Sequence, residues 1–412
     1  MAPKSASLYR ARGQHRSAGR NYHSRVSTIP ITGLFMVAGG RTLGREIVEL
    51  LQAEFCDPQK LNEWSENGHA AALLLAAKEN NNRLVNQLLS HLGVSHTKRF
   101  SADEIDYYHL LDTYASAGLR SPLKELFPAG VVQYVGIGVL VFEQGNRFFA
   151  SFVVPNEAAA ECEILPGDEL VSANGLPYKP IASFRGLGGR TVSLQFRREA
   201  NGSITECQVR PTILRPAKML AAASSASARV VPVRSKAIGY YKPWSLAGDR
   251  YWKLLVTTLL GPLQSCEALV LDLRGSIGGA SPDFAEFFIG RSPELNLSGA
   301  SKLKRTINPH WRKRTIVLVD GTTRSGNEIL AFALQRAGVL TVGSKTSGEV
   351  AAAKPFLLCD RSLLLIATHR VTVDGNILEG IGVKPDVEIH RQTAYSAGKD
   401  EQLSVALGLA AE

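Results

Sequence analysis

The chain has 412 residues, 45% hydrophobic and 20% charged, the balance of a globular protein long enough for two or three domains. No apolar run approaches the roughly 18 residues of a membrane-spanning helix, so no integral membrane span is expected. The net charge is +10, but residues 1–45 hold eight basic residues and no acidic one, which leaves only +2 for the rest and argues against nucleic acid as a partner.

Residues 1–42 form a basic tail, rich in Arg and Ser, that runs into the apolar stretch "IPITGLFMVAGG". Such a tail resembles a secretory signal or a presequence, and it also fits a disordered extension. The localisation, exported to the periplasm or medium or retained in the cell, therefore stays open. The five cysteines contain no C-x-x-C pair, so neither a metal nor a redox cofactor is expected. A bridge between Cys162 and Cys207 is left open by their spacing.

Residues 43–134 are predicted to be an N-terminal helical region. In "NRLVNQLLSHLG" the spacing of Leu84, Leu88 and Leu92 predicts an amphipathic helix, which Gly93 would end as a left-handed cap. Residues 135–213 contain short β-type runs between Gly and Pro turns and are predicted to be a β domain. The Ala/Ser-rich stretch 214–235 is interpreted as a linker.

Residues 236–391 alternate apolar strands with helices, and 392–412 are taken as a C-terminal segment. Strands such as "ALVLDL" and "TIVLVD" show no alternation of apolar and polar residues, which is typical of strands covered on both faces. The predicted fold class is therefore α/β, with a mostly parallel sheet flanked by helices.

Sites in such sheets gather where strands turn into helices at their carboxyl ends. Two turns of this kind stand out, "DLRGSIGGAS" and "DGTTRSGNE". Ser325 in the second turn would place a hydroxyl beside the N-terminal amides of a helix, where negative charge is stabilised. The structural alternative is that Ser325 is an ordinary N-cap and that Glu328 completes a capping box.

Four motifs in order resemble those of the C-terminal processing, or tail-specific, serine peptidases. They are "LVLDLRGSIGG", "VLVDGTTRSGNEILAFALQRAG", "TVGSKTSG" and "LEGIGVKPDVEI". The resemblance covers residues 45–391 and implies a crotonase- or Clp-protease-like superhelical core with an inserted PDZ-like domain over 135–213. Ser325 stands three residues before Glu328, as the nucleophile does in that family.

The resemblance leaves the base to be chosen between two branches of the family. The tail-specific branch uses a lysine in T-x-G-K-G, but here "TSGEV" places Glu349 at that position. A Ser–Lys dyad would have to use Lys345 or Lys354, neither of which is in register. The branch that includes the tricorn core uses a histidine from a turn after a helix, and "GVSHT" offers His96 in such a turn.

The same branch supplies a Glu from the C-terminal motif to hold the histidine, which points to Glu379 here. Ser95 would support this contact, and Glu349 is the competitor for the role of Glu379. A serine hydroxyl needs such a partner to accept its proton.

The resemblance also suggests the groups that would bind the substrate. Acyl transfer needs two backbone amides that bind the oxyanion. The alignment with the family motifs assigns these amides to Gly326 and Gly279, and Gly278 is the next candidate. The stretch "YVGIGV" resembles the carboxylate-binding loop of PDZ domains, which assigns substrate binding to Gly136, Ile137 and Gly138.

The interpretation is thus a serine endopeptidase with a Ser-His-Glu arrangement of Ser325, His96 and Glu379. It would act on peptides or proteins without a cofactor and would select substrates by their C-termini. A non-catalytic protein that binds peptides or small apolar ligands on the same scaffold is the rival hypothesis, and the oligomeric state is left open.

Overall fold

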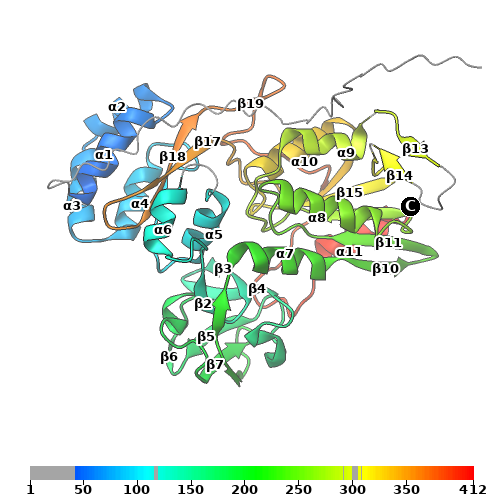
Figure 1. The fold of residues 1–412 in the computed structure, drawn as a ribbon, viewed down its shortest axis with the longest axis horizontal. Coiled ribbons are helices and arrows are strands. Elements are labelled where there is room, and N and C mark those ends of the chain that lie inside the picture. Colours follow the sequence, from blue (N-terminus) through cyan, green and yellow to red (C-terminus); the bar gives the residue numbers. More distant parts are fainter. Residues whose placement is uncertain (1–41, 116–118, 291, 299–304, 308) are drawn as a thin grey trace, which may run out of the picture. The chain divides into compact units, whose positions relative to one another are not determined.

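The computed structural model describes residues 42–115, 119–290, 292–298, 305–307 and 309–412. The basic tail expected over 1–42 lies outside this part of the chain, except for Thr42. The described residues form a mixed α/β fold, which confirms the α/β part of the predicted class (Figure 1). None of the described helices is long and apolar enough to cross a membrane.

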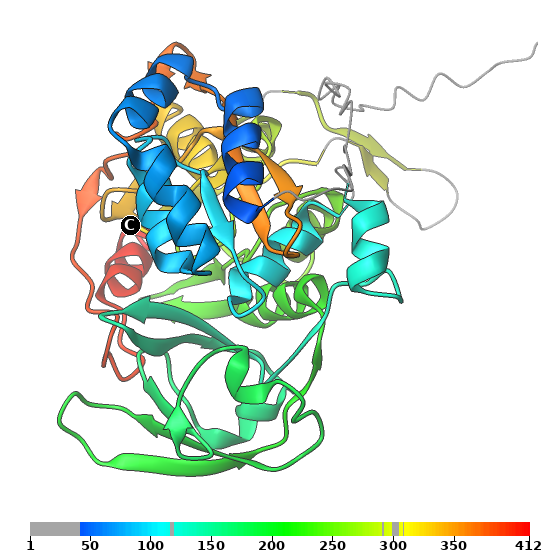
Figure 2. The same ribbon diagram turned by 90° about the vertical axis from the view of Figure 1, so that its left-hand side faces the viewer.

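The N-terminal region is a layer of helices packed against two strands from the C-terminal half. Its elements are α1 (Leu43–Glu54), α2 (Pro58–Glu66), α3 (His69–Lys78), α4 (Asn82–Ser90), β1 (Lys98–Phe100), α5 (Ile105–Thr113) and α6 (Arg120–Leu126). β1 pairs antiparallel with β18 (Leu363–His369), and β18 pairs with β17 (Ala352–Leu357). Figure 2 shows these orange strands beside the blue helices, with which they share an apolar core.

The helix α4 follows the spacing expected of it. Asn81 caps its first turn by accepting a hydrogen bond from the Leu84 N–H at 3.1 Å. Leu88 and Leu89 are buried in the core shared with β18. The helix ends at Ser90, before Gly93, which has the expected left-handed backbone with φ of 62°. The pairing of β1 with β18 carries the turn between α4 and β1, residues 93–97, toward the C-terminal part of the chain.

Residues 134–214 form a separate set of antiparallel strands. They are β2 (Tyr134–Gly136), β3 (Val139–Gln144), β4 (Arg147–Val153), η1 (Ala158–Cys162), β5 (Glu169–Ala173), β6 (Leu176–Pro177), η2 (Ala182–Phe184), β7 (Val192–Arg197), β8 (Ile204–Val209) and β9 (Thr212–Leu214). The main sheet has the order β3-β4-β5-β7-β8, and β2 pairs with β9 where the segment begins and ends. A disulfide joins Cys162 to Cys207 across this unit.

A six-stranded sheet lies at the centre of the C-terminal half. Its order is β10 (Arg229–Val233), β11 (Lys236–Tyr241), β12 (Ala268–Asp272), β15 (Arg314–Val319), β16 (Leu340–Gly343) and β21 (Val387–Glu388). The β10–β11 pairing is antiparallel, and the other four are parallel. Because the remaining described sheets are antiparallel, the chain as a whole has mixed sheets, and the expectation of a mostly parallel sheet fits only this central one.

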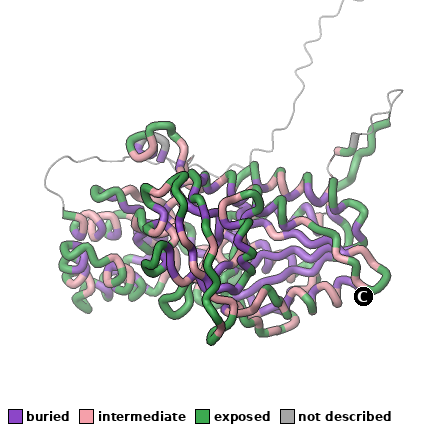
Figure 3. Tube along the Cα trace, turned by 90° about the horizontal axis from the view of Figure 1, so that it is seen from below, coloured by how far each residue is buried: buried purple, intermediate pink, exposed green. Residues whose placement is uncertain are grey.

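Helices cover both faces of the central sheet, which explains its unalternating apolar strands. On one face, Leu269 and Leu271 of β12 pack with α8 (Asp249–Leu260), α9 (Glu286–Ile289) and α10 (Gly326–Arg336). On the other face, Ala268 and Val270 pack with α11 (Glu401–Ala410). Figure 3 shows these strands as a buried band between the layers. The short elements η3 (Pro282–Ala285), β13 (Leu295–Leu297), β14 (Arg305–Ile307), β19 (Thr372–Val373) and β20 (Asn376–Ile377) lie in the connections.

The stretch 214–235 is not the linker that its composition predicted. It contains the helix α7 (Pro216–Ser227) and the edge strand β10. Alanine is the strongest helix former, and Pro216 at the first helical position suits a helix start. Met219 and Leu220 of α7 are buried against Trp244, so an Ala/Ser-rich composition marked a tightly packed helix here.

Candidate active site

Ser325 lies in the turn between β15 and α10, where the sequence placed it. Its backbone has φ of 59° and ψ of −137°. Residues other than glycine rarely adopt such a conformation, which costs on the order of 1–3 kcal/mol and is found mostly at functional sites. Ser325 is the N-cap of α10, yet its side chain makes no capping hydrogen bond. Its hydroxyl is therefore left available at the positive end of a helix.

Glu328 does not complete a capping box but holds the turn that follows β16. Its side chain is fully buried and accepts hydrogen bonds from the Thr346 hydroxyl and from the backbone N–H of Gly348 (2.7 Å) and Glu349 (2.8 Å). The Glu349 carbonyl in turn accepts from the Ser325 N–H at 2.7 Å. This turn is thereby fixed against the start of α10.

His96, Ser95 and Glu379 form a continuous chain of hydrogen bonds. The Ser95 hydroxyl lies 2.9 Å from His96 Nδ1 and donates to Glu379 Oε2 at 2.9 Å. The backbone N–H of Ser95 donates to Glu379 Oε1 at 2.6 Å. Glu379 Oε2 also accepts from the N–H of Val350 (2.8 Å) and Ala351 (2.9 Å). The structure thus brings Glu379 to Ser95, although the two are 284 positions apart, and so to the neighbouring His96.

These contacts determine which nitrogen of His96 carries the proton. A carboxylate only accepts hydrogen bonds, so the Ser95 hydroxyl donates to Glu379. The oxygen of Ser95 must then accept from Nδ1–H of His96, which leaves Nε2 with a free lone pair. His96 is thus held in the tautomer that a proton acceptor requires.

The surroundings of His96 favour its neutral form. Burial lowers its pKa below the usual value, and the positive charge of Arg324 lowers it further, against the opposing charges of Glu379 and Glu328. Arg324 and Glu328 flank Ser325 in sequence, so the imidazole lies close to the start of α10. Ser325 makes no hydrogen bond with His96 among the described residues, and such contacts often tighten only when substrate is bound.

The glycines expected to form an oxyanion hole lie where backbones approach closely. A Cβ on Gly326 would come 2.3 Å from the Ala280 carbonyl oxygen, and one on Gly279 would come 2.6 Å from the Ala247 Cα. Neither amide has a hydrogen-bond acceptor in the described part of the chain. Gly278 lies beside Ser325, since its added Cβ would be 3.1 Å from the Ser325 Cβ.

The alternatives to His96 and Glu379 have other contacts. Lys354 forms an ion pair with Glu54 of α1 at 2.8 Å, and Lys345 is exposed to solvent. Glu349 contacts the site through its backbone, which bonds to Ser325 and Glu328. Glu379, rather than Glu349, holds Ser95.

The predicted carboxylate loop in the β domain is closely packed. Gly136 lies in β2, and Ile137 is 2% exposed. A Cβ on Gly138 would come within 2.1 Å of the Glu157 Cβ, and Glu157 Oε2 accepts from the Thr212 hydroxyl at 3.3 Å. An acidic side chain therefore already lies beside these glycines, and their role in substrate binding stays a prediction.

A cavity of about 310 Å³ adjoins the turn that carries Ser325. Arg324, Ser347 and Glu349 line one side, while Phe142 and Trp244 belong to its apolar wall. His109 also lines it, and burial lowers the pKa of its imidazole to about 4. The cavity thus combines apolar side chains with the charges of Arg324 and Glu349.

Two charged residues near this turn, Arg324 and Lys242, were not among the site residues expected from the sequence. Arg324 precedes Ser325 directly, so its effect on a nearby histidine could have been anticipated from that adjacency. Lys242 follows β11 at the carboxyl end of a central parallel strand, where sites gather in such sheets. Its aromatic neighbours in "YYKPW" also mark it as a charged residue in apolar surroundings. No group of His, Cys, Asp and Glu among the described residues has a geometry suited to a metal ion.

The chain is similar to known proteases in sequence. Residues 238–389 match the model of peptidase family S41. The carboxy-terminal processing protease CtpA of Bacillus subtilis (strain 168) is 26% identical over 275 residues, which cover 62% of this chain and 56% of the relative. CtpB of the same organism, also a carboxy-terminal processing protease, is 24% identical over 283 residues, which cover 64% of this chain and 57% of the relative. The aligned regions thus span little more than half the length of these relatives.

The fold is also similar to that of solved structures at low sequence identity. The tricorn protease aligns with a TM-score of 0.52 and 15% identity, over 89% of this chain and 36% of that chain. The alignment extends well beyond the residues that match the family model, so the similarity in fold includes elements outside the central sheet.

Proposed function

We propose, from the premise that residues 238–389 belong to peptidase family S41, that this protein is a serine endopeptidase acting on peptides or proteins. The observation that carries the proposal is the hydrogen-bonded chain from Glu379 through Ser95 to His96, beside the strained turn of Ser325. With Glu349 in place of the lysine, the site fits the histidine-using branch of the family better than the Ser–Lys branch.

In the first step, the Ser325 hydroxyl attacks the carbonyl carbon of the scissile bond. The proton of the hydroxyl passes to Nε2 of His96, which becomes an imidazolium. Ser95 and Glu379 stabilise this cation through Nδ1–H. The lowered pKa of His96 keeps Nε2 free to accept the proton near neutral pH.

Negative charge then develops on the carbonyl oxygen, which the amides of Gly279 and Gly326 would stabilise. Each such donor contributes about 3 kcal/mol to the transition state. Both amides lack acceptors among the described residues, so neither must give up a protein contact to bind the oxyanion.

The acyl-enzyme forms when the carbon–nitrogen bond breaks and His96 gives its proton to the leaving amine. A water molecule then loses a proton to His96 and attacks the ester of Ser325. The collapse of this second intermediate returns the proton to Ser325 and releases the new carboxyl end.

The test is covalent labelling by a fluorophosphonate probe, followed by mass spectrometry of the labelled peptide. We expect one label on Ser325 in the wild type and none on the Ser325→Ala variant, which also loses cleavage of a casein substrate. Ser404→Ala, a change at an exposed serine of α11, serves as the matched control and should label like the wild type.

Two outcomes would reject the proposal. If Ser325→Ala were labelled and active, another nucleophile would carry the reaction. If the folded wild type neither reacted with the probe nor cleaved casein, the rival hypothesis of a non-catalytic binding protein would replace ours.

We also propose that residues 135–213 act as a PDZ-like domain that adds an extended peptide as a strand and helps to select C-termini. The antiparallel sheet β3-β4-β5-β7-β8 supports this, because β3 at its edge offers backbone groups for such pairing.

A further inference from the structure

A second cavity, of about 500 Å³, lies between the β domain and the central sheet. We call it the Lys242 pocket. Its lining includes Trp244, Gly275 and Thr322, and these three residues also line the smaller cavity beside Ser325. The two cavities therefore adjoin, which places the Lys242 pocket next to the cavity beside the turn of Ser325.

The ammonium of Lys242 is a largely buried cation that makes no hydrogen bond to the described residues. The side chain is 13% exposed, and its Nζ lies 4.2 Å from the centre of the Trp244 ring. The nearest charge is Asp272, whose Oδ2 lies 4.0 Å from Nζ, beyond hydrogen-bond distance. None of the three donors of this ammonium has an acceptor within the described residues.

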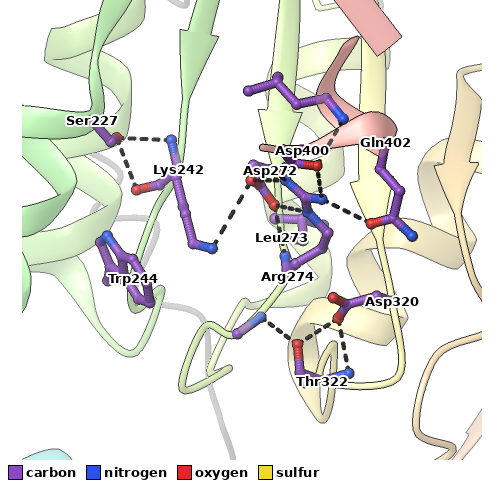
Figure 4. A network of polar contacts seen from close by, with 12 residues as sticks. Ser227, Lys242, Trp244, Asp272, Leu273, Arg274, Asp320, Thr322, Asp400 and Gln402 are labelled. Carbon is purple, nitrogen blue, oxygen red and sulfur yellow. Dashed lines mark hydrogen bonds and ion pairs between the residues drawn. The ribbon is translucent and has the colours of Figure 1, made fainter. Parts of the chain in front are cut away.

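Asp272 cannot supply the missing acceptor because nearer donors already use both of its oxygens. Oδ1 accepts from the backbone N–H of Arg274 (3.1 Å) and from its Nε (2.8 Å). Oδ2 accepts from the Tyr240 hydroxyl (2.8 Å) and from the Arg274 guanidinium (2.7 Å). Figure 4 shows Arg274 between Asp272 and Asp400, and its dashed line from Lys242 to Asp272 marks the 4.0 Å ion pair, which is longer than the hydrogen bonds around Arg274.

The balance of charge in the pocket favours an anion. Five basic residues and three acidic ones line it, a net charge of +2. Two of the acids, Asp272 and Asp400, are already paired with Arg274. Burial lowers the pKa of Lys242, against the effect of Asp272, so its charged form gains stability when an anion arrives.

Part of the pocket wall is apolar. Val141, Phe142 and Phe152 from β3 and β4 line it, together with Trp244. The Trp244 side chain is 3% exposed, and its indole N–H also lacks an acceptor among the described residues. The pocket thus combines a cation with apolar surface, which suits a carboxylate attached to an apolar group.

We propose that the Lys242 pocket binds the C-terminal carboxylate of a peptide, with the ammonium of Lys242 as its receptor and the apolar walls holding the last side chain. The identification of this peptide as the substrate rests on the proposed function. The binding of its carboxylate does not depend on that function. Gly138 is a poorer receptor because the side chain of an acidic residue, Glu157, already packs against it.

The experiment measures binding without cleavage, in full-length protein carrying Ser325→Ala. A fluorescein-labelled peptide that ends in Leu is compared with its C-terminal amide by fluorescence anisotropy. Hydrogen bonds to charged groups are strong, so we expect the acid to bind about tenfold or more tightly than the amide. Lys242→Met should remove this difference, and Lys242→Arg should retain part of it.

Lys399→Met is the matched control, because Lys399 lines the same pocket but is exposed, and it should retain the preference for the acid. Thermal unfolding of each variant checks that it is folded. N-acetyl-leucine and inorganic phosphate serve as competitors that distinguish a peptide end from a free acid or any anion. N-acetyl-leucine should compete only at concentrations far above those of the peptide, and phosphate should compete less well.

Equal binding of acid and amide would overturn the proposal. So would a preference that survives in folded Lys242→Met, which would assign the carboxylate to Gly136–Gly138 instead. Displacement by phosphate as effective as that by the peptide would reduce the pocket to a general anion site. Because no cleavage is needed, the result stands whether or not Ser325 proves to be the nucleophile.

Discussion

Glu379 holds Ser95 at two points, although the residues are 284 positions apart in the sequence. Its Oε1 accepts from the Ser95 N–H at 2.6 Å, and its Oε2 accepts from the Ser95 hydroxyl at 2.9 Å. The hydroxyl also lies 2.9 Å from Nδ1 of His96. The carboxylate therefore acts on the imidazole through Ser95, so Ser95 is a positioning residue with a measurable role.

Replacing Ser95 with alanine should lower kcat and leave KM nearly unchanged. The substitution removes the group that fixes the His96 tautomer, and general-base catalysis contributes about 10²–10⁴-fold. Ser95→Thr keeps a hydroxyl and should retain most of the activity. Steady-state kinetics on a fluorogenic peptide would check this, and a Ser95→Ala variant with wild-type kcat would contradict it.

His96, and not a lysine, should be the base. His96→Ala should lose several orders of magnitude in kcat/KM, whereas Lys345→Ala and Lys354→Ala should stay near the wild type. Activity requires neutral His96, so it should fall as the pH drops through a pKa below about 6.5. An active His96→Ala variant combined with an inactive lysine variant would favour a Ser–Lys dyad.

Arg324 should set the position of the acidic limb of the pH profile. Its positive charge lowers the pKa of His96, after burial as the larger cause. Arg324→Gln removes that charge, so the pKa rises and the limb of kcat/KM should move to higher pH. Arg336→Gln, at the far end of α10, is the control and should leave the limb in place. A limb that stays fixed, or moves to lower pH, in Arg324→Gln would refute this electrostatic account.

Arg274 should be essential for stability rather than chemistry. Burial would raise the pKa of Asp272, but the charges of Arg274 and Lys242 outweigh it and hold the pKa well below its usual range. Arg274→Gln leaves Asp272 buried without its main partner and should lower the free energy of unfolding by about 3–5 kcal/mol. Arg185→Gln breaks an exposed pair with Asp103 and should cost less than about 1 kcal/mol. Urea unfolding of both variants tests this, and equal losses would contradict it.

Local patterns in the sequence were sufficient for several features. The spacing of Leu84 and Leu88 predicted α4, and unalternating apolar runs predicted the central strands, because such strands are buried on both faces. The position of Ser325 between a strand and a helix was also visible. The residues 214–235 were misread, because an Ala/Ser-rich composition describes a linker and a buried helix equally well until the packing of Met219 and Leu220 is seen.

Only the tertiary structure decided how the distant groups meet. The sequence by itself determined the covalent order: a hydroxyl before a helix, a histidine in a turn after α4, and a carboxylate in a C-terminal turn. The pairing of β1 with β18 brings His96 and Ser95 to Glu379, and the hydrogen bonds of Val350 and Ala351 orient that carboxylate. Likewise, the sequence does not show that Lys242 lacks a hydrogen-bond acceptor. This follows only from the donors that already occupy the oxygens of Asp272. Whether a polar group is left without a partner depends on contacts across hundreds of residues, and no local pattern contains that information.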